Sequence, residues 1–147
     1  MSPDLVFTAC SWGVLPAWGL LAFAPGWLGT QRLVHTVWIP CLLGLVYLLT
    51  FLTSPGLPEG GGFGSLTGVT ILFTSPHAVL AGWVHYLVFD LFVGAWQVRD
   101  ARRRGVPQLW MLPCLLFTLM LGPIGLLLYL ALRFARLRVT TLAESAG

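Results

Sequence analysis

Long apolar runs dominate the chain. Four stretches of nearly uninterrupted hydrophobic residues cover residues 5–24, 33–52, 77–98 and 106–132. A helix needs roughly 20 apolar residues to cross a hydrocarbon core about 30 Å thick, at about 1.5 Å per residue. A backbone that spans lipid must satisfy its own polar groups, so we expect each run to be helical. The pattern predicts an all-α, polytopic membrane protein whose four transmembrane helices form a bundle.

The segment between the second and third runs is irregular. Residues 54–64 are rich in glycine and proline, which indicates a loop. Residues 66–73 are apolar but too short to cross, so they predict a short interfacial or re-entrant segment before the third helix. Ser75 and Pro76 suit the N-cap and the first helical position, and they mark where the third helix should begin.

The fourth run is longer than a crossing requires. It contains Pro113 and the pair Gly122-Pro123, so we expect the helix to be tilted or kinked. The connection before it, residues 99–105, is short and should make the third and fourth spans antiparallel neighbours. We therefore treat residues 1–147 as a single integral membrane domain with a basic C-terminal tail at 133–147.

Composition narrows the class of protein further. The 147 residues are 57% hydrophobic and 9% charged, whereas soluble domains carry about 25% charged residues. So few charges cannot cover a surface that faces water, which excludes an ordinary soluble enzyme, a disordered tail and a module that binds nucleic acid. The three cysteines lie in separate apolar runs without a CxxC spacing, so we expect no metal centre. Nothing in the sequence indicates a cofactor.

The basic residues set an expected orientation. All eight are arginines: five lie in the first and third loops and three follow the last predicted span. The five are Arg32, Arg99, Arg102, Arg103 and Arg104, and the three are Arg133, Arg136 and Arg138. Because cytoplasmic loops are enriched in basic residues, this distribution favours both termini outside the cytoplasm. The arginine-only, glycine-rich composition is typical of bacteria, so we expect a multi-pass protein of the bacterial inner membrane.

Asp90 is the one charged residue predicted deep inside a span. Placing aspartate at a helix centre costs about 2.5–3.5 kcal/mol on insertion scales, which makes it a functional candidate. The alternative is a structural hydrogen bond to another helix. At about 100° per residue, Trp83, Tyr86, Gly94 and Gln97 fall within about 40° of Asp90. Of these residues, Tyr86, Gly94 and Gln97 form with Asp90 a narrow polar and small stripe that should face the protein interior.

His85 points to a different neighbour. It lies about 140° from Asp90 on the same helical wheel, so the two cannot hold one metal ion from a regular helix. Small residues such as Ala78 and Gly82 share its face, which favours close helix packing. Depth matching places His85 near the level of Trp12, Tyr47 and Gly122. We keep structural hydrogen bonding and a catalytic role for His85 as alternatives.

Prolines add broken-helix positions near these groups. A proline frees a backbone carbonyl one turn earlier, for example that of Leu119 ahead of Pro123. The hydrocarbon core favours the neutral form of a carboxyl, and a neutral Asp90 can donate to such a carbonyl. Broken helices beside polar groups are typical of membrane sites for ligands, and Gly122 would provide room there.

Several stretches together resemble the abscisic acid-deficient 4-like family. They are PAWGLLAFAPGW at 16–27, GGGFGSLTGVTILF at 60–73, GWVHYLVFDLFVGAWQVRDA at 82–101 and LPCLLFTLMLGPIGLLLYL at 112–130. The resemblance implies a small four-span membrane protein. Plant members are plastid proteins needed to make neoxanthin from violaxanthin, so it also implies a carotenoid-modifying, isomerase-like activity. Opening an epoxide and forming an allene require an acid and a base. Asp90 and His85 would supply them.

These observations lead to two hypotheses of different classes. In the preferred one, the protein acts on or binds a carotenoid or other isoprenoid lipid within the bundle. Its catalytic groups would be Asp90, His85 and Tyr86, and its ligand-binding residues Trp83, Gly94, Gln97, Gly122 and Pro123. In the alternative, it is a non-enzymatic scaffold or assembly partner whose buried polar residues only lock helices together. A small oligomeric transporter ranks third. Whether the protein is an enzyme stays open, as does a homo-oligomer; membrane lipid is the expected partner.

Overall fold

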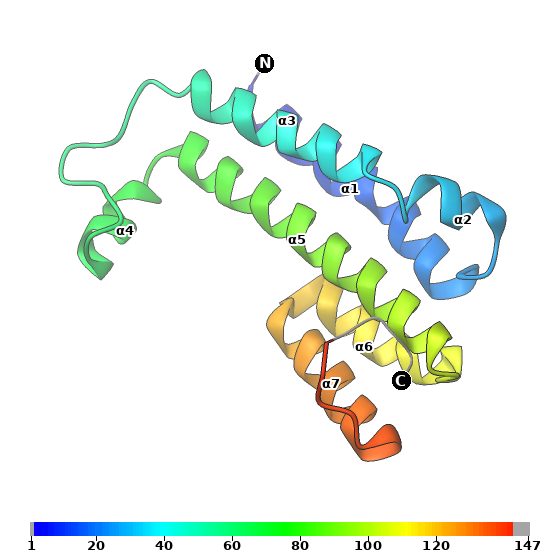
Figure 1. Ribbon diagram of the computed structural model, residues 1–147. Helices are drawn as coiled ribbons and strands as arrows, with labels where there is room; N and C mark the ends of the chain where they lie inside the picture. The colour runs from blue at the N-terminus through cyan, green and yellow to red at the C-terminus, as the bar shows by residue number, and fades with distance from the viewer. Residues whose placement is uncertain (1, 143–147) are drawn as a thin grey trace. The chain divides into compact units, whose positions relative to one another are not determined.

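The computed structural model describes residues 2–142, and within that range it consists of helices joined by turns and loops (Figure 1). The helices are α1 (Pro3–Phe23), α2 (Leu28–Leu33), α3 (Trp38–Leu52), α4 (Leu66–Leu72), α5 (Pro76–Arg103), α6 (Gln108–Leu121) and α7 (Pro123–Leu137). The all-α prediction is confirmed for these residues. The part of the predicted tail beyond residue 142 lies outside the described residues.

The chain folds as two compact units. The first unit comprises Met1–Val14 and Trp38–Val88, and the second comprises Leu15–Val37 and Phe89–Gly147. The first unit therefore contains α3, α4, the start of α1 and the first half of α5. The second contains α2, α6, α7, the end of α1 and the second half of α5. Each unit is described on its own below.

Three described segments are long and apolar enough to cross a membrane. They are Pro3–Phe23, Leu28–Leu52 and Pro76–Arg103. The second of them is interrupted between Leu33 and Trp38, where α2 ends and α3 begins. These segments correspond to the first three predicted spans.

The predicted fourth span, residues 106–132, is not a single helix. Gly122 has φ +41° and ψ −90°, outside the helical region, and it separates α6 from α7. Pro123 follows at the start of α7, where a proline needs no hydrogen-bonded N–H. The expected kink is therefore a complete break. The two helices have 14 and 15 residues, so each is about 21–23 Å long and shorter than a membrane core.

Local signals place other helix ends correctly. Pro76 opens α5, as predicted. The short apolar segment before it is the helix α4, whose N-cap Ser65 accepts a hydrogen bond from the Gly68 N–H at 3.0 Å. Two predicted ends were wrong. α5 continues through Arg103, into the predicted connection at 99–105, and α7 contains Arg133, which was assigned to the tail.

Side chains of the second unit satisfy the carbonyls at the end of α1. The Gln108 side-chain amide donates to the carbonyls of Leu21 and Ala22, at 2.9 and 3.0 Å. The Thr30 hydroxyl donates to the Ala24 carbonyl at 2.6 Å. The last carbonyls of a helix have no partner within that helix, so these bonds fix both the start of α6 and α2 against the end of α1.

Candidate functional site

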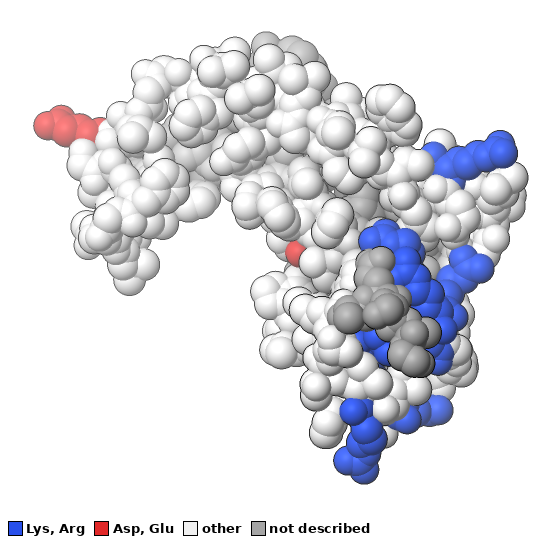
Figure 2. All heavy atoms as spheres, viewed as in Figure 1, with Lys and Arg blue, Asp and Glu red and all other residues white. Residues whose placement is uncertain are grey.

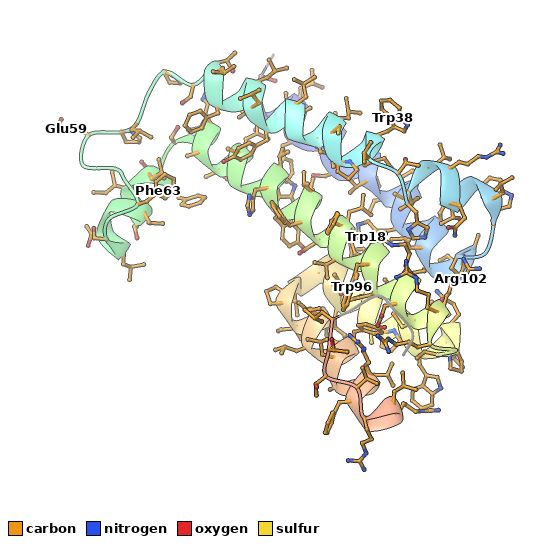
Figure 3. All side chains as sticks on the ribbon, in the orientation of Figure 1. Trp18, Trp38, Glu59, Phe63, Trp96 and Arg102 are labelled. Atoms are coloured by element: carbon orange, nitrogen blue, oxygen red, sulfur yellow. The ribbon has the colours of Figure 1, made fainter. Side chains whose placement is uncertain are left out.

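An apolar cavity lies in the first unit, between α3, α4, α5 and the loop that joins α3 to α4. Its volume is about 290 Å³. The lining includes four aromatic side chains and two histidines: Tyr47, Phe51, Phe63, Phe73, His77 and His85. Phe63 extends from the segment just before α4 (Figure 3). A largely apolar, concave surface with a few polar groups is typical of a small-molecule site.

His85 brings an imidazole to this cavity. Its ring centroid lies 6.3 Å from that of Tyr47 on α3, which confirms the expected level of the two residues. Ala78 and Gly82, predicted to share the face of His85, line the same cavity. An ideal Cβ on Gly82 would lie 2.8 Å from Cε1 of Phe73, so the glycine allows this ring to approach α5 closely.

A second cavity adjoins the first. It has a volume of about 360 Å³ and lies between the start of α1, α3 and α5. Cys10, Val46 and Leu80 contribute apolar surface to it. Thr50 and His77 line both cavities, so these two side chains stand at their common border. A ligand longer than one cavity could therefore extend from the first cavity into the second.

Trp83 packs toward α1. The Trp83 indole N–H donates to the Ser11 hydroxyl at 2.9 Å, and its ring centroid lies 5.1 Å from that of Phe7. Tyr86, on the same helix, contacts the Trp83 ring in a tilted arrangement, with ring centroids 5.2 Å apart. These contacts give Trp83, predicted as a ligand-binding residue, a defined packing role in the first unit.

The remaining part of the predicted stripe lies in the second unit. An ideal Cβ on Gly122 would lie 2.7 Å from Oδ1 of Asp90, so the carboxyl rests against the break between α6 and α7. An ideal Cβ on Gly94 would lie 2.7 Å from the Trp18 ring, which extends from α1 (Figure 3). Gln97 is fully buried and donates to the Thr118 hydroxyl at 3.0 Å. The predicted inward orientation of Asp90, Gly94 and Gln97 is confirmed.

A buried charged cluster, which the sequence analysis missed, also lies in the second unit. Asp100 is 2% exposed and Arg133 is 1% exposed. Oδ2 of Asp100 accepts a hydrogen bond from the Tyr129 hydroxyl at 2.6 Å and lies 3.3 Å from Nε of Arg133. Oδ1 accepts from Nε of Arg104 at 2.8 Å. Trp96 packs edge-on against Tyr129, with ring centroids 5.5 Å apart (Figure 3).

Part of this cluster had a signal in the sequence. Asp100 and Arg104 are four residues apart, the spacing at which opposite charges pair on a helix. The assignment of residues 99–105 to a connection hid that spacing. Arg133 had no comparable signal, because it is distant in sequence and only tertiary packing pairs it with Asp100.

The predicted catalytic residues are divided between the units. His85 and Tyr86 belong to the first unit and Asp90 belongs to the second. His85 faces an apolar cavity, whereas Asp90 lies against the break between two helices. Among residues 2–142, no three His, Cys, Asp or Glu side chains form a group that could hold a metal ion. The catalytic roles of these residues stay predictions.

The three long apolar segments fit the class of polytopic helical membrane proteins. The family model described as ABA DEFICIENT 4-like matches residues 5–129, so the chain belongs to this ABA4-like family. Searches of the curated proteins and of the solved structures found no match. The family match includes Asp90, His85 and both glycines of the Gly122–Gly125 segment, and it ends before Arg133.

Proposed function

We propose that the protein binds a carotenoid or a related isoprenoid lipid inside the membrane, with one end of the lipid in the cavity of the first unit. The aromatic, apolar lining of that cavity and its accessible imidazole support this proposal. Its volume of about 290 Å³ is at the lower end of the range for small-molecule sites. It therefore suits one end of a long lipid, and the adjoining cavity offers space for a further part.

Polar groups in the cavity favour a lipid that carries oxygen at its end. His85 and Tyr47 are adjacent, and an imidazole and a phenol can each donate or accept a hydrogen bond. A hydroxyl or epoxide oxygen on the lipid would meet these groups, whereas a hydrocarbon end would leave them facing apolar atoms. We therefore expect oxygenated carotenoids to bind more tightly than hydrocarbon carotenoids.

Catalysis is a second candidate, and the imidazole of His85 beside an apolar cavity favours it. In this hypothesis His85 acts as the base and Tyr86 as the acid of an isomerase-like reaction within the first unit, and Asp90 is a separate candidate acid in the second unit. The contact of Asp90 with Gly122 also suits the structural alternative, in which this carboxyl holds helices together. Replacing Asp90 by asparagine separates these possibilities, because an amide keeps the shape but cannot supply the acidic proton.

A pigment-binding experiment tests the proposal. The full chain is expressed in a carotenoid-producing bacterial host and purified in detergent, and the bound pigment is measured by absorbance and chromatography. Ala81→Phe places a ring in the cavity and should reduce bound pigment several-fold. Val79→Phe adds the same ring on the exposed face of the same helix and should leave binding unchanged. His85→Leu should preferentially weaken binding of the oxygenated pigments.

The outcomes are distinct. Equal pigment in Ala81→Phe and Val79→Phe would contradict a site in this cavity. Absence of pigment from the wild-type protein, together with identical lipid profiles in cells with and without the gene, would reject carotenoid binding altogether. The non-enzymatic scaffold would then be the better hypothesis.

A further inference from the structure

The helices α6 and α7 form a hairpin that is too short to cross a membrane. Four residues separate the end of α5 from the start of α6, and the other end of α6, at Gly122, lies against Asp90 on α5. α6 therefore runs back along α5 from Arg103 to about the level of Asp90. At about 1.5 Å per residue this distance is about 20 Å, compared with a core of about 30 Å.

The second helix of the hairpin returns to the end from which the first one came. Contacts of α5 with Gly122 and with α7 follow a nearly constant register: Asp90 meets Gly122, Trp96 meets Tyr129, and Asp100 meets Arg133. Residue numbers rise together along both helices, so α7 runs parallel to this half of α5. The buried pair of Asp100 and Arg133 thus fixes the last turns of α7 beside the last turns of α5.

The hairpin has a close internal contact that keeps its helices together. An ideal Cβ on Gly125 would lie 2.1 Å from the backbone nitrogen of Thr118, so only glycine allows α7 to approach α6 this closely. Irregular backbone at membrane depth is tolerated where protein buries it. The Asp90 carboxyl at Gly122 supplies a polar neighbour for the hairpin tip.

All eight arginines lie in the second unit (Figure 2). Arginines at the end of α5 contact the segment that follows α1. Arg99 Nη1 lies 3.3 Å from His35 Nδ1, and Arg102 Nη1 donates to the Pro25 carbonyl at 2.6 Å. Arg104 and Arg133 share Asp100. The segment after α1, the end of α5 and the end of α7 therefore meet within one unit.

We infer that α6 and α7 form a re-entrant hairpin, which enters and leaves the membrane from the side that holds the arginines. The chain then crosses three times, and its C-terminal segment lies on the same side as the connection between α5 and α6. In a four-span arrangement the arginines divide five to three between the two sides. In the re-entrant arrangement all eight lie on one side, which the positive-inside rule assigns to the cytoplasm. The N-terminus would remain outside and the C-terminal segment would be inside.

Labelling of single cysteines tests this topology in the full chain. Cys10, Cys41 and Cys114 are replaced by alanine, and one cysteine is then introduced as Gly64→Cys, Pro107→Cys or Thr140→Cys, at positions that are exposed. Intact cells are treated with a membrane-impermeant maleimide, and permeabilised cells confirm that every site is reactive. We expect labelling in intact cells at residue 64 and at least ten-fold less labelling at residues 107 and 140.

Each other result has one meaning. If residue 140 is labelled like residue 64 while residue 107 is protected, the chain crosses four times and the proposal is wrong. If residues 107 and 140 are both labelled while residue 64 is protected, the hairpin is re-entrant but the cytoplasmic position of the arginines is wrong. The labelling pattern does not depend on which lipid the protein binds.

Discussion

The two units use polar residues in opposite ways. In the first unit, His77 and His85 line apolar space that a ligand can fill, and the charged residues there are Asp4 and Glu59. In the second unit, polar and charged side chains contact one another across helices, as Gln97 does with Thr118. The difference indicates that a polar side chain among membrane helices marks a candidate ligand site only where space adjoins it.

The largest effect should follow from breaking the charged cluster of the second unit. Asp100→Ala leaves Arg133 buried without its carboxylate, which typically costs about 3–5 kcal/mol. The free energy of unfolding, measured by denaturant titration in detergent, should fall by that amount. Glu59→Ala, an exposed change in the first unit, is the control and should have no effect. The double variant Asp100→Leu/Arg133→Leu should recover much of the lost stability. If the double variant is as unstable as Asp100→Ala, the two residues do not form a specific pair.

A smaller effect is expected from the close contact inside the hairpin. The methyl group of Gly125→Ala would overlap the Thr118 backbone and force α6 and α7 apart, at a cost of about 1–3 kcal/mol. Gly19→Ala is the matched control, since a Cβ there meets nothing within 4 Å and alanine favours a helix. Thermal unfolding of both variants measures the difference. Equal melting temperatures would mean that the two helices are not this close.

The buried amide should contribute less. Gln97→Leu removes a hydrogen bond to Thr118, whose hydroxyl still donates to the Cys114 carbonyl at 2.8 Å. Side-chain hydrogen bonds between membrane helices average about 0.6 kcal/mol and reach about 1.7 kcal/mol. We expect a loss in that range in the same titration, without a change in bound pigment. Loss of pigment from this variant would assign Gln97 to ligand binding after all.

Asp90→Asn should have the smallest effect on stability, within about 0.5 kcal/mol, since the amide fits the same space beside Gly122. Pigment bound in the first unit should be unchanged. Chromatography of the lipids from cells that carry the wild-type protein or Asp90→Asn then tests whether Asp90 takes part in a reaction. A substrate that accumulates with Asp90→Asn, in a protein that is folded and inserted, would make Asp90 catalytic and would contradict a purely structural role.

Properties that depend on neighbouring residues along one helix were predictable from the sequence. The helical period correctly placed Asp90, Gly94 and Gln97 on an inward face, and Ser75 with Pro76 marked the start of α5. A helix wheel needs only the spacing of residues, so no tertiary information was required.

The errors came from features that only tertiary structure determines. Hydropathy cannot distinguish one long helix from two short ones in a continuous apolar run, so the break at Gly122 appeared only as a kink. This error also affected the depth estimate, which placed Gly122 level with His85, whereas Gly122 lies against Asp90. The same assumption left Arg133 in a tail, when the return of α7 buries it against Asp100.

The buried pair of Asp100 and Arg133 also determines how much of the chain is needed. The family model ends at residue 129, but Arg133 lies one turn further along α7, which ends at Leu137. A shortened protein cut at the family boundary would keep Asp100 and Arg104 but lose Arg133, the second guanidinium beside this carboxylate. Nη2 of Arg133 also donates to the Thr141 carbonyl, so the smallest version suitable for expression extends through Thr141, and a purification tag belongs after that residue.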